Sequence, residues 1–125
     1  MTDIKVLVVD DDELLREMLK GWLHLAGFSV VSAANGEDGL LILEAHRPDV
    51  VVTDLTMPVM DGIQFCREAR KISDVPILVF SGLPDKECRE SAMTAGADGY
   101  VVKNIGMSAF ISTVEGLAKR RKQVA

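Results

Sequence analysis

Five short apolar runs alternate with longer segments of helical periodicity, and this alternation constrains the fold more than any other feature of the chain. The apolar runs are rich in Val and Ile and show little alternation of polarity, which is typical of strands covered on both faces. We expect strands at 4–9, 28–33, 50–53, 76–80 and 99–102. The pattern predicts a doubly wound α/β fold of (βα)5 type, with a parallel five-stranded sheet and right-handed crossovers.

Apolar residues at three- and four-residue steps predict a helix after each strand. The first has the inward set Leu15, Met18, Leu19, Trp22, Leu23 and Ala26, with Gly27 where a C-cap glycine is expected. We expect the other helices at 36–46, 62–72, 85–95 and 108–122. Their inward sets are Leu40, Leu43 and Ala45, then Phe65, Cys66, Ala69 and Ile72, and last Phe110, Ile111, Val114 and Leu117. The 85–95 helix has few large apolar residues, so we expect it to be the most mobile.

Length and composition exclude several classes of protein. The chain has 125 residues, 48% of them hydrophobic, which predicts a single domain over 1–125 with no output domain. Cys66 and Cys88 match no zinc or redox spacing, so we expect reduced thiols in a cytoplasmic protein. No signal peptide or membrane span is predicted. The net charge of -5 argues against direct DNA binding.

Charged and hydroxyl side chains follow four of the five predicted strands. Asp10 and Asp11 follow the first, Asp54 the third, Ser81 the fourth and Lys103 the fifth. Each alone has a structural explanation, such as a helix N-terminus, a loop position or a solvated strand end. Because the carboxyl ends of parallel strands meet at one edge of the sheet, where ligands bind in open α/β folds, we expect these side chains to form one site.

Three clustered carboxylates repel one another, which favours a cation among them. Mg²⁺ takes oxygen ligands and binds through one or two carboxylates together with phosphate oxygens, and this fits Asp10, Asp11 and Asp54. Lys103 and Ser81 are donors suited to a charged group beside the metal. The combination predicts an aspartyl-phosphate site, in which positioning and electrostatics carry phosphoryl transfer.

Four segments of the chain resemble the receiver domains of two-component response regulators, including single-domain chemotaxis regulators. They are VLVVDDD at 6–12, DLTMPVMDG at 54–62, ILVFSG at 77–82 and GADGYVVK at 96–103. The resemblance implies a flavodoxin-like three-layer sandwich with strand order 2-1-3-4-5. It also implies a phosphorelay switch rather than an enzyme, one that catalyses only its own phosphorylation and slow dephosphorylation.

By the same resemblance, Asp54 accepts the phosphoryl group, and Mg²⁺ (or Mn²⁺) is held by Asp10, Asp11 and Asp54. The backbone carbonyl of Thr56 completes the protein ligands. Asp12 and Glu13 then fall outside the metal pair, as acids at the start of a helix.

The remaining family positions concern the response to phosphorylation. Lys103 bridges to the phosphoryl oxygens, Ser81 moves to bond the phosphate, and Tyr100 turns inward as the aromatic switch. The implied partners are a sensor histidine kinase or phosphotransfer protein and a downstream target bound through the fourth helix, fifth strand and fifth helix. A phosphorylation-dependent homodimer stays open as an alternative.

Three positions depart from or tune the family pattern. The family usually has a cis proline after its lysine, whereas Asn104 follows Lys103 here, and we predict a trans peptide because a non-proline cis bond costs about 2.5–4 kcal/mol. Thr56 and Leu83 correspond to positions that line the approach of the hydrolytic water. Leucine cannot orient a water, so we expect slow self-dephosphorylation.

Other functional classes fit less well. A flavodoxin-like electron carrier would need to hold a phosphate where this chain has acids, and an aspartyl-nucleophile phosphatase needs a second acid where Thr56 stands. The serious alternative is a receiver-like interaction module that works without phosphorylation. The basic run at 119–122 is interpreted as a solvated helix end, with a nucleic-acid or partner contact as the alternative.

Overall fold

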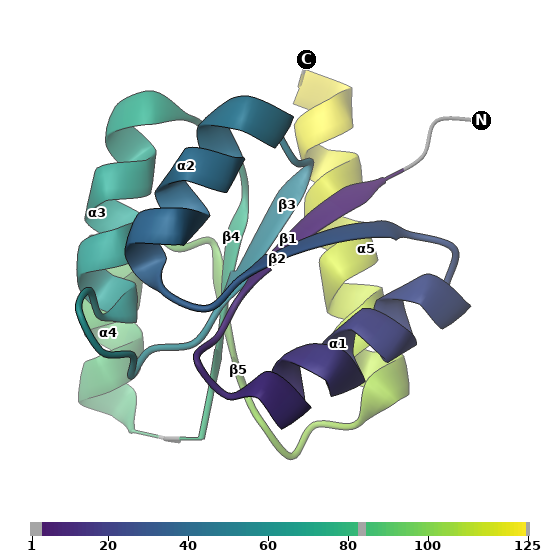
Figure 1. Cartoon of the computed structure of the whole chain (residues 1–125), viewed down its shortest axis with the longest axis horizontal. Helices are drawn as coiled ribbons and strands as arrows, with labels where there is room; N and C mark the ends of the chain where they lie inside the picture. The colour runs from purple at the N-terminus through teal and green to yellow at the C-terminus, as the bar shows by residue number, and fades with distance from the viewer. Residues whose placement is uncertain (1–3, 83–84, 125) are drawn as a thin grey trace.

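The computed structural model describes residues 4–82 and 85–124, and within them strands and helices alternate along the chain (Figure 1). The strands are β1 (Lys5–Val9), β2 (Ser29–Ala33), β3 (Val50–Thr53), β4 (Ile77–Ser81) and β5 (Gly99–Val102). The helices are α1 (Glu13–Leu25), α2 (Gly36–His46), α3 (Gly62–Ile72), α4 (Lys86–Thr94) and α5 (Met107–Val124). Each strand, and each helix whose bounds were predicted, begins and ends within two residues of those bounds.

The five strands form one parallel sheet in the order β2-β1-β3-β4-β5, which confirms the predicted topology. Helices α1 and α5 cover one face of the sheet, and α2, α3 and α4 cover the other (Figure 1). The order reverses at β1, so β1 and β3 lie side by side in the centre. The loops after these two strands therefore meet at one edge, where open α/β sheets bind ligands.

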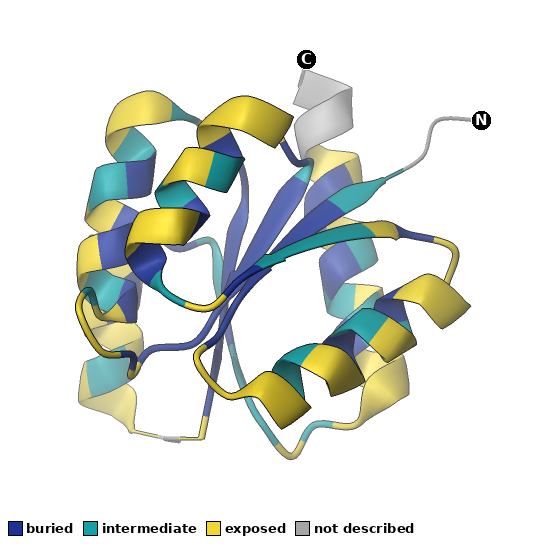
Figure 2. Cartoon of the chain, viewed as in Figure 1, coloured by how far each residue is buried: buried dark blue, intermediate teal, exposed yellow. Residues whose placement is uncertain are grey.

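Successive residues of each central strand point into different cores, because side chains alternate across a sheet. Leu7 and Val9 of β1 lie in the core under α2, α3 and α4, whereas Val6 and Val8 lie in the core under α1 and α5. All four are fully buried, and Figure 2 shows the central strands as the most buried part of the molecule. Burial on both faces explains the continuous apolar runs of the sequence.

Some residues predicted to point inward are exposed. Met18, on the margin of the α1 stripe, is 37% exposed, and Leu19 and Leu23 carry the buried contact instead. Ala26, Ala45 and Ile72 stand at the last turns or C-caps of their helices, where the chain leaves the sheet, and they are exposed as well. Periodicity gives the direction of a side chain but not the distance of a helix end from the sheet.

Helix α4 has the weakest apolar anchor among the helices, as its composition predicted. Ala92 is its one buried residue, and Cys88 packs against the core from a half-buried position. Met93 is 41% exposed. In the part of the chain that the structure describes, no helix is both long and apolar enough to cross a membrane.

Candidate functional site

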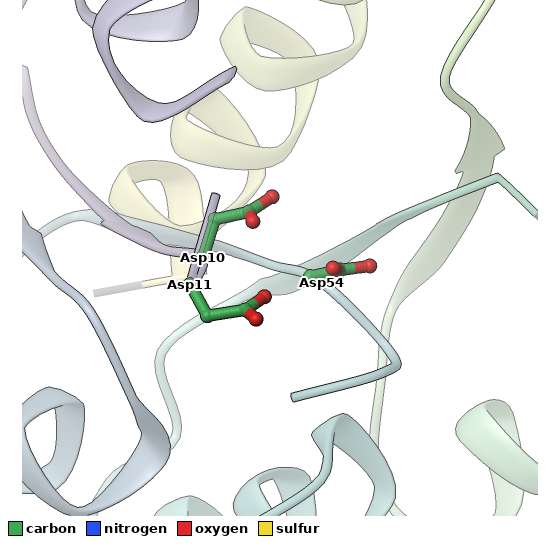
Figure 3. A group of neighbouring side chains, drawn as sticks. All are labelled: Asp10, Asp11 and Asp54. Carbon is green, nitrogen blue, oxygen red and sulfur yellow. The ribbon is translucent and has the colours of Figure 1, made fainter. Parts of the chain in front are cut away.

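Three of the predicted carboxylates meet at the carboxyl edge of the sheet. Asp10 follows β1 and Asp54 follows β3, and both are buried, whereas the neighbouring Asp11 is exposed. One carboxylate oxygen of each lies within 4.8 Å of the others. Figure 3 shows the side chains of Asp10 and Asp11 extending toward Asp54. The sheet order brings Asp10 and Asp54 together although 44 positions separate them in the sequence.

Backbone N–H groups hold the two buried carboxylates in place. The N–H of Leu55 donates to Asp54 Oδ1 at 2.7 Å, and the N–H of Asp12 donates to Asp10 Oδ1 at 2.9 Å. The main chain at both positions continues the sheet, since the N–H of Asp54 donates to the Val9 carbonyl at 3.0 Å. Each carboxylate thus has one oxygen bound by its own loop and a second oxygen, Oδ2, facing the site.

Lys103 supplies the cation of the site. Its Nζ lies 3.2 Å from Asp54 Oδ2 and 3.7 Å from Asp10 Oδ2. The N–H of Lys103 donates to the Ser81 carbonyl at 2.8 Å, which extends the pairing of β4 and β5 to the site. The peptide that joins Lys103 to Asn104 is trans, as predicted, because no described residue takes part in a cis bond. The lysine therefore reaches the acids without a cis proline at the next position.

The pKa of Asp10 is raised from its ordinary value of 3.8 to about 6, chiefly because the group is buried. The N–H of Asp12 and the ammonium of Lys103 oppose this rise, while the charges of Asp54 and Asp11 contribute to it. One lysine does not offset three carboxylates, so the ionised form of the site is unfavourable without another cation. Three carboxylates with oxygens this close fit a hard divalent ion such as Mg²⁺, which neutralises them and prefers oxygen ligands.

Gly62 lets helix α3 begin directly against the loop that carries Asp54. Its N–H donates to the Leu55 carbonyl at 2.7 Å. A Cβ on this residue would lie 2.8 Å from Leu55 Cα and would collide with the Asp54 carbonyl oxygen. Gly62 is therefore required because any side chain here would collide with the loop that carries Asp54. The sequence indicated this residue only as the start of a helix.

Arg16 is a residue of the site that sequence reasoning missed. It lies one turn into α1, and its Nη1 donates to the Asp10 carbonyl at 2.8 Å. A charged donor on this carbonyl holds the peptide between the two adjacent aspartates. Its spacing from Asp10 offered no signal, because Arg16 also fits an ordinary exposed position of an amphipathic helix.

Asp12 and Glu13 lie outside the cluster, as predicted. Asp12 is the N-cap of α1 and accepts hydrogen bonds from the N–H groups of Leu14 and Leu15. Glu13 is the acid of the first turn. Both serve the helix start, where carboxylates satisfy unpaired N–H groups and the helix dipole.

The other predicted site residues take different positions around the acids. Ser81 is buried at the end of β4, and Tyr100 is buried in β5, in the core under α2, α3 and α4. Thr56 is exposed in the loop after β3. Leu83, predicted to line the water approach, lies outside the described residues.

A mainly apolar groove of about 490 Å³ runs between α4 and β5. Its lining residues are Asp85, Lys86, Arg89, Tyr100, Val101, Val102 and Ile105. Tyr100 thus forms part of the wall of this groove while it also belongs to the core. Two of its lining residues, Val102 and Ile105, flank Lys103, which follows β5.

Comparison with curated proteins returns transcriptional regulators of about twice the length. The "Probable transcriptional regulator ycf27" of Porphyridium aerugineum is 39% identical over 116 residues, which are 93% of this chain and 48% of that protein. The "Transcriptional regulatory protein PrrA" of Mycobacterium tuberculosis is 36% identical over 126 residues, covering 100% and 54%. The chain spans about half the length of these relatives, so their names do not assign a DNA contact to this half.

Solved structures share the fold over nearly their whole length. The Vibrio cholerae chemotaxis protein CheY4 has a TM-score of 0.86 and 31% identity, with 93% of this chain and 99% of that chain covered. The signal receiver domain of NarL from Mycobacterium tuberculosis has a TM-score of 0.89 and 31% identity, covering 95% and 98%. The family model described as "Response regulator receiver domain" matches residues 6–115. The chain therefore belongs to the response regulator receiver domains of two-component signalling.

Proposed function

We propose that this chain is a phosphorylation-dependent switch that accepts a phosphoryl group on Asp54. The observation that carries the proposal is the buried Asp54 carboxylate with Lys103 Nζ at 3.2 Å and the carboxylates of Asp10 and Asp11 beside it. A structural ion pair would not need two additional acids. An acceptor that must hold a metal and a phosphoryl group does need them.

The transfer is a displacement at phosphorus. A carboxylate oxygen of Asp54 forms a bond to the phosphorus atom, while the bond from phosphorus to the histidine nitrogen of the donor breaks and its electron pair stays on that nitrogen. Lys103 offsets negative charge on the phosphoryl oxygens. Asp10 and Asp11, with Asp54 and the Thr56 carbonyl, would hold Mg²⁺, which when bound supplies further neutralisation of those oxygens. By this proposal the domain catalyses only its own phosphorylation and dephosphorylation.

The switch would act through the end of β4 and the groove beside β5. Ser81 stands at the end of the strand next to Lys103 and would bond the new phosphoryl group. Tyr100 links the core to the groove wall, so a change in its packing alters the surface formed by α4, β5 and α5. A shift between two such arrangements, biased by the charge on Asp54, would change the affinity for a target protein.

The positions of Thr56 and Leu83 bear on the lifetime of the phosphorylated form. We propose that Leu83 leaves the hydrolytic water without a polar partner and so slows dephosphorylation. The variant Leu83→Glu should then lose its phosphoryl group faster than wild type in the presence of Mg²⁺. An unchanged or slower loss would remove this part of the proposal.

Incubation with acetyl phosphate and Mg²⁺ tests the main proposal. We expect intact-protein mass spectrometry to show one added phosphoryl group, and NMR shifts to change at α4 and β5. The variant Asp54→Asn should show neither effect, and chelation of Mg²⁺ should prevent both. If wild type shows no modification, or Asp54→Asn responds equally, the chain would instead be an interaction module that works without phosphorylation.

A further inference from the structure

Val59 has a strained backbone conformation in the loop between β3 and α3. Its φ is 73°, and the N–H of Met60 donates to the Pro58 carbonyl at 2.8 Å, which closes a three-residue turn around it. The form of this γ-turn with positive φ is rare and strained. A β-branched residue at positive φ is an outlier, whereas glycine adopts such angles readily.

The turn itself has a structural purpose. Met60 is half-buried and packs against the core. Its Sδ lies so close to Gly36 that a Cβ on that glycine would be only 2.9 Å from it. Met57, on the other side of the turn, is buried as well. These two methionines anchor the loop, and the turn between them allows both to face inward.

The side chain of Val59 has no such purpose within the chain. It is 74% exposed, although it is apolar and stands at the point of highest strain in the loop. Glycine at this position would make the same turn without the strain. The turn supports the fold, but the exposed side chain of Val59 does not. A residue that breaks a local rule without benefit to the fold is a candidate for a contact outside the chain.

The location of Val59 indicates what that contact is. It lies five residues after Asp54, in the loop that follows β3. Leu14, 84% exposed in the first turn of α1, follows the neighbouring strand β1. Two exposed apolar side chains therefore stand at the edge of the sheet that carries the acids. A small phosphodonor needs neither, whereas a protein donor must place its own surface on this edge to bring a phosphohistidine to Asp54.

We propose that Val59 is a contact residue for the protein phosphodonor, packing on an apolar side chain next to the donor's phosphohistidine. It takes no part in the bond changes at phosphorus, and it favours transfer from a protein over transfer from a small molecule. This inference rests on the function proposed above. Burial of one valine side chain in the encounter accounts for a rate difference of about tenfold, or about 1.4 kcal/mol.

The test compares two donors on the same variants. Purified histidine-kinase cores are autophosphorylated and screened against wild type, and the core with the fastest transfer is used as the probe beside acetyl phosphate. For Val59→Gly we expect kcat/KM from the kinase core to fall about tenfold, with the acetyl phosphate rate unchanged. Val59→Ile should retain transfer, and Leu25→Ala should match wild type, because Leu25 is 81% exposed at the far end of α1.

Urea unfolding separates this role from a structural one. We expect the unfolding midpoint of Val59→Gly to equal or exceed that of wild type, since the strain is relieved. A lower midpoint, an unchanged kinase rate, or an equal loss with both donors would overturn the inference. Failure of acetyl phosphate to modify wild type would instead overturn the proposed function itself.

Discussion

The two ends of the sheet use the same kinds of charged residue in opposite ways. At the carboxyl end, Asp10 and Asp54 share one ammonium, that of Lys103, and Asp11 adds a third carboxylate beside them. At the amino end, Arg70 and Asp98 form a single ion pair of 2.6 Å between α3 and the start of β5. The first arrangement has an excess of negative charge, and the second is balanced.

Hydrogen bonds complete the balance at the amino end. Arg70 Nε donates to the Gly96 carbonyl at 3.0 Å, and its Nη1 donates to the Val75 carbonyl at 2.5 Å. Asp98 Oδ2 also accepts from the N–H of Ile77 at 2.9 Å. The pair thereby ties the starts of β4 and β5 to α3. It is a structural ion pair, whereas the carboxyl end keeps unfavourable charge for a ligand to neutralise.

Removing a charge at the amino end should therefore destabilise the protein. We expect Asp98→Ala to lower the free energy of unfolding by about 3 kcal/mol, because Arg70 loses its partner and the Ile77 N–H loses its acceptor. The side chains of the pair are about a quarter to a third exposed, which keeps the loss at the low end for a buried pair. Urea unfolding by circular dichroism measures it. A loss below about 1 kcal/mol would contradict a structural role for the pair.

Removing a charge at the carboxyl end should instead stabilise the protein. We expect Asp10→Asn to raise the free energy of unfolding by about 2–3 kcal/mol at pH 8 without divalent ions, because the burial of an ionised carboxylate is relieved. Asn retains an oxygen for the Asp12 N–H. The same urea experiment with a chelator measures the gain, and a destabilised variant would show that the acid serves the fold.

The pH dependence of the free energy of unfolding should also reflect the raised pKa of Asp10. The raised pKa of Asp10 means that the folded state holds this proton more tightly than the unfolded state does. Its contribution is therefore fully present below about pH 4 and is lost as pH rises through about 6, by about 2–3 kcal/mol. Unfolding at several pH values should show this decline in wild type and not in Asp10→Asn. Parallel profiles would mean that Asp10 titrates normally.

Mg²⁺ should discriminate between the two ends. At ten times its dissociation constant, a ligand specific for the folded state stabilises by about 1.4 kcal/mol. We expect this gain in wild type and in Asp98→Ala, and a much smaller gain in Asp10→Asn. Thermal unfolding with and without Mg²⁺ measures it. Equal gains in all three proteins would place the ion outside the acidic cluster.

Exposed ion pairs should contribute least to the free energy of unfolding. Lys71 and Glu68 lie 2.9 Å apart on the outer side of α3, which is close to the 2.6 Å separation of Arg70 and Asp98. We expect Glu68→Ala to change the free energy of unfolding by no more than about 0.5 kcal/mol, because solvent and salt screen the attraction. A loss as large as that of Asp98→Ala would show that distance, rather than burial and added hydrogen bonds, controls these interactions.

Much of the site could be predicted because it follows from local pattern. The apolar runs locate the strands, and the residue after each run is brought to the carboxyl edge by parallel topology alone. Asp10, Asp54 and Lys103 were found in this way. The trans peptide before Asn104 also followed from a local energy, the cost of a non-proline cis bond.

The sequence by itself determined the order of elements, the two-sided burial of the strands and the gathering of acids at one edge. Only the tertiary structure decided that Arg70 pairs with Asp98, 28 positions away, that Arg16 turns back to the Asp10 carbonyl, and that Val59 is exposed in a strained turn. The physical reason is the distance along the chain over which each kind of interaction acts. Periodicity and capping depend on near neighbours, whereas partners, burial of charge and loop strain depend on how distant segments pack together.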